Sequence, residues 1–112
     1  RPGGCSALAE TPRLGHQPIA MVRLAGDRPH GRRPQPGEFY WQIEDGRRSL
    51  VIAMPCQGGT YGLFCEWSID FKNHCGAQWT WDGNEDQPTL SPSLHAVGWW
   101  HGWCRAGELV EA

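Results

Sequence analysis

The stretch from Gly76 to Leu109 constrains the fold more than any other part of the chain, because it combines large aromatic side chains with signals for tight turns. It holds five of the seven tryptophans, two of the five histidines and one cysteine. Turn-forming sequences occur at Asp82-Gly83-Asn84 and at Arg105-Ala106-Gly107. This pattern predicts short strands joined by turns.

The middle of the chain predicts further strands. Phe39 to Ile43 and Ser49 to Ala53 are rich in β-forming residues, and Asp45-Gly46 between them is typical of a tight hairpin turn. Polar and apolar residues alternate strictly from Tyr61 to Asp70, which indicates a strand with one buried face. The residues on that apolar face are Leu63, Cys65, Trp67 and Ile69.

The fold class follows from these strands together with three more, at Ala77 to Trp81, Val97 to Cys104 and Glu108 to Glu111. No segment of ten or more residues shows a helical period with caps. We therefore expect an all-β domain, a small barrel or sandwich of five to seven strands. Pro88 to Leu94, with prolines four residues apart, is expected to be an extended, irregular segment or an edge strand.

Residues 1–37 hold six of the nine prolines and predict an extended arm that precedes a β-domain of residues 38–112. One short strand is expected within the arm, at Ile19 to Leu24. The arm is either a flexible tail or a segment that packs on its own domain or on a neighbouring subunit. We expect self-association, or binding of a protein partner, to use it.

The charge is unevenly distributed, although the net charge is only −2. Residues 1–48 carry eight basic and five acidic groups, and residues 49–112 carry two basic and seven acidic ones. An acidic main body argues against nucleic-acid binding. The sequence has no apolar run that could span a bilayer, and residues 1–20 lack a secretory signal. We expect a cytoplasmic protein with reduced cysteines.

The cysteines and histidines suggest a zinc site, because a body of about 75 residues is near the lower limit for one hydrophobic core. Loop cysteines are the better donors, and these are Cys56 and Cys75. His101 could complete the site, with Cys104 as a fourth candidate. The familiar repeated pairs of cysteines two residues apart are absent, so the alternative is that these thiols and imidazoles only pack in the fold.

Other candidate sites have equally open interpretations. His101, surrounded by tryptophans, is either a packed side chain or a ligand or general base. The carboxylates Asp82, Glu85 and Asp86 form either an acid–base site or a solvated turn. The tryptophans are either core residues or a stacking platform. The sequence contains neither a phosphate-binding loop nor the nucleophile elbow of many hydrolases.

A family resemblance rests on four parts of the chain: Trp79 to Asn84, Pro88 to Ser93, His101-Gly102-Trp103, and Gly107. Their order resembles a family of small bacterial and phage-associated proteins of unknown function, some of them labelled ammonia monooxygenase. The resemblance implies a β-rich domain with a metal site, and carries over two of its positions, Cys56 and His101.

The sequence therefore predicts a phage-related structural or interaction module that zinc could stabilise. Two alternatives are a metal-dependent hydrolase, with His101 and either Asp82 or Asp86 in a cleft, and a tryptophan-lined module that binds carbohydrate or single-stranded nucleic acid. Whether the protein is an enzyme stays open at this point.

Overall fold

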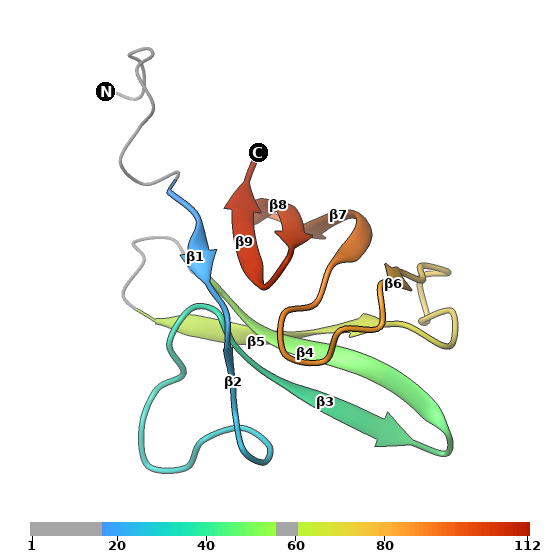
Figure 1. Cartoon of the computed structure of the whole chain (residues 1–112), viewed down its shortest axis with the longest axis horizontal. Coiled ribbons are helices and arrows are strands. Elements are labelled where there is room, and N and C mark those ends of the chain that lie inside the picture. The colour runs from blue at the N-terminus through green and yellow to red at the C-terminus, as the bar shows by residue number, and fades with distance from the viewer. Residues whose placement is uncertain (1–16, 56–60) are drawn as a thin grey trace.

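The computed structural model describes residues 17–55 and 61–112, which form two stacked β-sheets (Figure 1). One sheet has five strands in the order β1-β9-β8-β7-β6, and the other has four in the order β2-β3-β4-β5. The strands are β1 (Ile19–Ala20), β2 (Val22–Arg23), β3 (Glu38–Glu44), β4 (Arg47–Pro55), β5 (Gly62–Ser68), β6 (Thr80–Trp81), β7 (Leu90–Ala96), β8 (Trp100–Arg105) and β9 (Glu108–Glu111).

The four-stranded sheet is built around the β3–β4 hairpin. Asp45 and Gly46 take φ angles of 54° and 75°, as the predicted two-residue turn requires. Strand β4 then pairs antiparallel with β5 over seven residue pairs, from Ser49↔Ser68 to Pro55↔Gly62.

The five-stranded sheet is built around two hairpins that share β8. Residues 97–99 turn β7 into β8, and the amide of Trp99 donates to the carbonyl of Ala96 at 3.0 Å. Ala106 and Gly107, with φ angles of 47° and 77°, turn β8 into β9. The predicted Arg105-Ala106-Gly107 turn is thus confirmed.

The chain passes from one sheet to the other at Met21, which lies between β1 and β2. Its amide donates to the carbonyl of Gly107 at 2.8 Å. At the other end of the sheets, the amide of Trp79 donates to the carbonyl of Ser68 at 2.9 Å. Between the sheets lies one core of buried side chains, which includes Phe39, Leu50, Ile52, Met54, Trp67, Leu90, Leu94, Trp100, Cys104 and Leu109.

The all-β prediction is confirmed, and the described residues contain no helix. The strand count exceeds the predicted five to seven because β1, β2 and β6 are only two residues long. Residues 90–96 form an internal strand between β6 and β8, where an irregular segment or edge strand was expected. Its prolines fit because Pro88 precedes the strand and Pro92 lies in an irregular part of the β7–β8 pairing. None of the described segments could cross a membrane as a helix.

Candidate functional site

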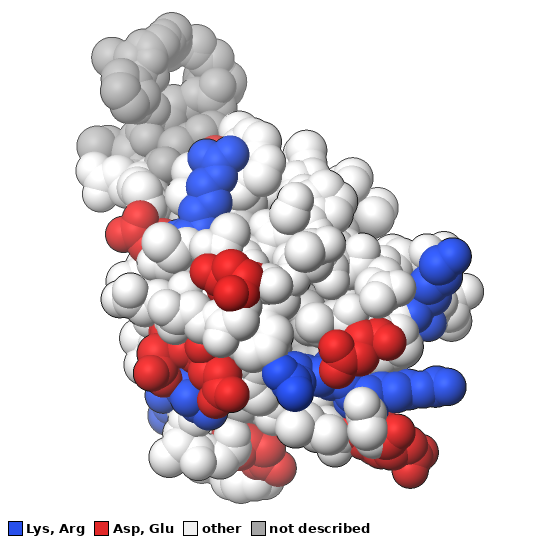
Figure 2. Space-filling view, turned by 45° about the vertical axis from the view of Figure 1, so that its right-hand side comes forward, with Lys and Arg blue, Asp and Glu red and all other residues white. Residues whose placement is uncertain are grey.

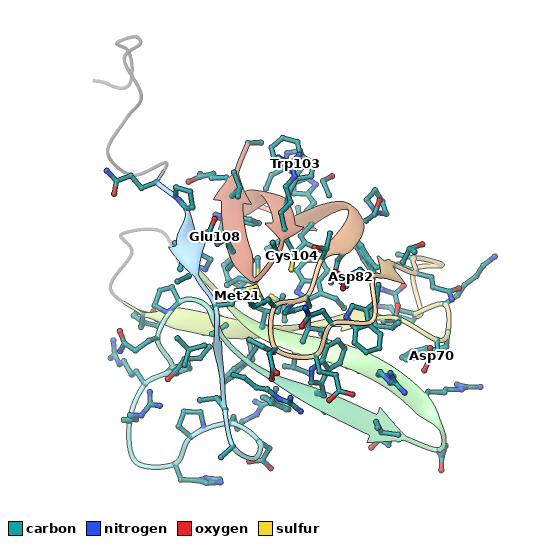
Figure 3. The ribbon with its side chains drawn as sticks, viewed as in Figure 1. Met21, Asp70, Asp82, Trp103, Cys104 and Glu108 are labelled. Atoms are coloured by element: carbon teal, nitrogen blue, oxygen red, sulfur yellow. The ribbon has the colours of Figure 1, made fainter. Side chains whose placement is uncertain are left out.

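The candidate site lies on the outer face of the five-stranded sheet, on the β7–β8 hairpin. Alternate residues of β8 face opposite ways: Trp100 and Cys104 are buried, whereas His101 is exposed and Trp103 partly exposed. Figure 3 shows Trp103 pointing away from the sheets and Cys104 pointing toward Met21 between them. The outer face of this hairpin therefore carries polar and aromatic groups above an apolar core.

A serine and a histidine meet on this face. Oγ of Ser93 lies 3.2 Å from Nε2 of His101. The contact lies beside an irregular part of the β7–β8 pairing: Leu90 pairs with Cys104 and Leu94 with Gly102, so three residues of β7 lie opposite Trp103. Such a bulge redirects a side chain from the regular position. Ser93 is the last of those three residues, directly after Pro92, whose peptide bond with Ser91 is cis.

A hydrogen bond and a buried neighbour fix the backbone at Ser93. Its carbonyl accepts a hydrogen bond from Nε1 of Trp79 at 3.1 Å, and the Trp79 ring packs edge-on against Trp67 with centroids 5.0 Å apart. The next residue, Leu94, is fully buried in the core. Ser93 is therefore an outward-facing residue fixed by two core contacts.

His101 is held by its own strand and by neighbouring rings. Its carbonyl accepts the amide of Ala112 at 2.9 Å, which ties it to the end of β9. Its imidazole lies 5.0 Å from that of His95 and 6.3 Å from the Trp103 ring, centroid to centroid. In the part of the chain that the structure describes, Ser93 Oγ is the hydrogen-bond partner of this imidazole.

This arrangement has the geometry of a nucleophile beside its base. A neutral imidazole nitrogen at hydrogen-bond distance can take the proton of a serine hydroxyl as the oxygen attacks an electrophile. Residues 91–104 include no Asp, Glu, Lys or Arg, and a nearby charged group is the Arg105 guanidinium, which lies 4.6 Å from the centroid of the Trp103 ring. On the face in Figure 2, most charged side chains lie in the lower half of the view, and some lie in the upper half.

The predicted metal ligands that the structure describes, Cys75, His101 and Cys104, do not form a cluster. Cys104 is fully buried on the inner face of β8, where its thiol contacts the carbonyl of Pro88 at 3.3 Å and Sδ of Met21 at 3.6 Å. Burial raises the pKa of this thiol to about 12. Cys75 is exposed in the loop after β5, and Cys56 lies outside the described residues.

Within 17–55 and 61–112, no three His, Cys, Asp or Glu side chains gather as a metal site. His101 and Cys104 leave β8 on opposite faces. The zinc site that includes Cys56 stays a prediction.

The other candidates have partners of their own. Asp82 accepts the amides of Asn84 and Thr89, and Asp86 pairs with Arg23 at 2.9 Å. Glu85 also pairs with Arg23, at 3.3 Å. Each is engaged in or beside the turn after β6. The tryptophans are all buried or partly buried, which agrees with the interpretation that they form core.

Ser93 is the candidate residue that the sequence analysis did not single out. It was part of the recognised Pro88 to Ser93 segment but was not identified as a candidate. Its signal was weak, because a serine on a bulged strand lacks the glycine-framed pattern of a nucleophile elbow. The available clue was a serine eight residues before a histidine, on two segments that could form a hairpin.

Comparison with known proteins gives the family. No curated protein and no solved structure matches the chain. A family model described as "Bacterial ubiquitination-like system serine protease (BubE)" matches residues 25–112. That description replaces the unknown function expected from the resemblance, and gives no support to the expected phage association. Because the match covers the whole Ser93–His101 hairpin and most of the chain, this protein belongs to the BubE family.

Proposed function

We propose that this protein is a serine protease acting in a bacterial ubiquitination-like system, with Ser93 as nucleophile and His101 as general base and acid. The observation that carries the proposal is the 3.2 Å contact between Ser93 Oγ and His101 Nε2. The description of the family supports it independently, since it names a serine protease.

The chemistry would proceed in two halves. Oγ of Ser93 attacks the carbonyl carbon of a peptide bond while its proton passes to Nε2 of His101. The imidazolium then protonates the leaving nitrogen, the C–N bond breaks, and an acyl-serine ester is left on the protein. Water next attacks this ester, gives its proton to His101, and releases the carboxylic acid as Ser93 recovers its proton.

The test is covalent labelling by a fluorophosphonate, which loses fluoride as its phosphorus bonds to an activated serine oxygen. We expect one label per chain, located at Ser93 by peptide mass spectrometry. Ser93→Ala should abolish it. Ser91→Ala is the matched control, because Ser91 is exposed on the same strand and has no contact with His101.

His101→Ala should slow labelling at least about 100-fold, the usual contribution of a positioned general base. No label in the folded wild-type protein, or labelling that survives Ser93→Ala, would refute the proposal.

A further inference from the structure

Beyond Ser91, the outer edge of β7 pairs with no strand among the described residues, although the Trp79 indole donates to the carbonyl of Ser93 there. Strand β6 pairs only with Leu90 and Ser91 of β7. Just before β6 the chain lies against the other sheet, where the amide of Trp79 bonds Ser68. Strand β7 nevertheless continues to Ala96. Its second half thus has β8 on one side and, among the described residues, no strand on the other.

The register shows which backbone groups point to this open edge. The carbonyl of His101 bonds Ala112 on the β9 side, so it does not bond its cross-strand partner His95. In an antiparallel ladder, a residue in such a non-hydrogen-bonded pair directs its own N–H and C=O toward the opposite edge. The short distance between the His95 and His101 rings, 5.0 Å, agrees with that type of pair. His95 therefore presents a donor and an acceptor to the open edge, two residues from Ser93.

We propose that the substrate binds as an extended strand along this edge, with its backbone hydrogen-bonded to the N–H and C=O of His95. Adding a strand to an open sheet edge is a common way for proteins to hold extended peptides. The substrate is thus an unstructured peptide segment, such as the flexible tail of a protein, and not the surface of a folded domain. This inference rests on the proposed function, because it places the peptide bond at Ser93.

A hollow near the end of the hairpin offers a place for one side chain of this peptide. Its volume is about 480 Å³, and its walls are largely apolar. Trp99, whose amide bonds Ala96, forms one wall, and β5, the last strand of the other sheet, forms another. The lining residues are Arg28, Pro29, Pro34, Leu63, Phe64 and Trp99.

The position of the hollow sets a preference along the peptide. Ser93 and Ala96 are three residues apart on a strand, about 10 Å at roughly 3.3 Å per residue. A peptide strand beside β7 covers the same distance with the same number of residues. We therefore expect a preference for a large apolar side chain three or four residues from the cleaved bond.

The experiment compares reversible serine-directed inhibitors of two sizes. Each inhibitor is tested for its ability to protect Ser93 from the fluorophosphonate. The large inhibitors are acetylated tetrapeptide boronic acids with an apolar residue at each position in turn, and the small one is phenylboronic acid. Peptide boronates should protect more tightly than phenylboronic acid. The tetrapeptide boronates are also methylated at one peptide nitrogen at a time. Methylation of the nitrogen that donates to His95 should weaken the protection of Ser93 by about fivefold to tenfold, the effect of one lost hydrogen bond.

His95→Pro removes the proposed donor but no ladder bond, because that N–H faces the open edge, where proline is tolerated in sheets. Relative to His95→Ala, it should weaken the tetrapeptide boronates by about fivefold to tenfold and leave phenylboronic acid unchanged. His95→Ala keeps the N–H and loses the same ring beside His101, which makes it the matched reference.

The proposal is overturned if peptide boronates bind no better than phenylboronic acid, if no N-methylation weakens them, or if a folded His95→Pro protein binds them as tightly as His95→Ala does. Should His95→Pro fail to fold, the N-methylated series on the wild-type protein decides alone. Failure of the proposed function gives a different result, since the fluorophosphonate then does not label Ser93 at all.

Discussion

The hydroxyl of Ser93 lies 3.2 Å from Nε2 of His101, beside the point where β7 carries extra residues opposite β8. His101 pairs directly with His95, and Ser93 lies diagonally across the two strands, within reach of the imidazole. Leu94 anchors this part of β7 in the core. The proposed nucleophile and base thus lie on one hairpin, without an elbow between strand and helix.

Trp79→Phe should slow the labelling of Ser93 with only a modest loss of stability. The substitution keeps an aromatic ring against Trp67 but removes the indole N–H that bonds the Ser93 carbonyl at 3.1 Å. Without this bond we expect labelling about fivefold to tenfold slower, and a free energy of unfolding lower by about 1 kcal/mol. Labelling kinetics and urea denaturation measure the two effects.

Trp81→Phe is the matched control for this prediction. Its indole N–H bonds the carbonyl of Asn84 at 3.0 Å, in the turn after β6. The loss of stability should be similar, because the bond is of the same kind, while Ser93 should be labelled at the wild-type rate. Equal labelling rates in both variants would mean that Trp79 does not position Ser93.

Gly102→Ala should disturb the site by crowding the buried face of β8, beneath His101. A Cβ at Gly102 would clash with the carbonyl oxygen of Val110 and lie 2.7 Å from Cη2 of Trp100 and 2.9 Å from Cα of Glu111, so the backbone of β9 must move as well as the Trp100 ring. Overpacking of this kind costs about 1–3 kcal/mol. Because His101 precedes Gly102, the labelling of Ser93 should slow as well.

Gly26→Ala provides the comparison, since a Cβ at Gly26 meets no atom within 4 Å. Its midpoint of thermal unfolding should stay close to that of the wild type. If Gly102→Ala unfolds at the same temperature as Gly26→Ala and Ser93 is labelled at the wild-type rate, the close packing under His101 contributes neither to stability nor to the site.

The parts of this fold that could be predicted are those with strong local sequence patterns. Alternation around Trp67 and the Asp45-Gly46 turn each have a direct physical meaning in one strand or one hairpin, and both the strand and the turn are confirmed. The predicted buried face holds for Trp67 and Ile69, whereas Leu63, expected on the same face, is 46% exposed. Two-residue strands such as β6 could not be foreseen, because they exist only through pairing with a distant segment. The strand around Pro92 was underestimated, since proline alone argues against an internal strand.

The site was harder to predict than the fold. His101 was singled out from the sequence, but its hydrogen-bond partner was sought among cysteines and carboxylates. The neighbour of His101 depends on the register between β7 and β8, including its bulge, and no sequence pattern specifies that register. The faces of β8 were predictable by alternation, and they place Cys104 on the side opposite to His101.

Cys104 should resist alkylation while Cys75 reacts. Burial raises the pKa of Cys104 to about 12, so almost no thiolate exists at pH 8, whereas Cys75 is exposed. Iodoacetamide followed by peptide mass mapping should show modified Cys75 and unmodified Cys104 in the folded protein. In urea both should react, and equal rates in the folded state would contradict the burial of Cys104.

The raised pKa of Cys104 also implies that the stability of the protein falls at alkaline pH. In the unfolded chain Cys104 ionises near its ordinary pKa of 9.0, and in the folded protein only near 12. Its contribution to stability is complete below about pH 9 and is lost as the pH rises toward 12. Cys104→Ala should therefore reduce the fall in unfolding free energy between pH 9 and 11, measured by denaturation at each pH.

Glu38→Gln should destabilise the protein near neutral pH and weaken its response to acid. Arg32 donates two hydrogen bonds to the Glu38 carboxylate, at 3.0 and 2.7 Å. This pairing, assisted by the amide of Gln35, holds the pKa of Glu38 below its ordinary 4.5 despite burial. The stabilisation is therefore present above about pH 4.5 and is lost as the pH falls through the lower folded pKa.

Removing the charge should cost about 1–2 kcal/mol at pH 7, because Arg32 loses its charged partner, and less at pH 3, where the Glu38 carboxylate is itself being neutralised. Glu44→Gln, an exposed change at the end of the same strand, is the control and should be nearly neutral. The Arg32–Glu38 pair also fastens the loop that supplies Arg28, Pro29 and Pro34 to the apolar hollow. Glu38→Gln should thus weaken the binding of peptide boronates more than the binding of phenylboronic acid. Equal effects on both inhibitors would mean that this loop does not contribute to peptide binding.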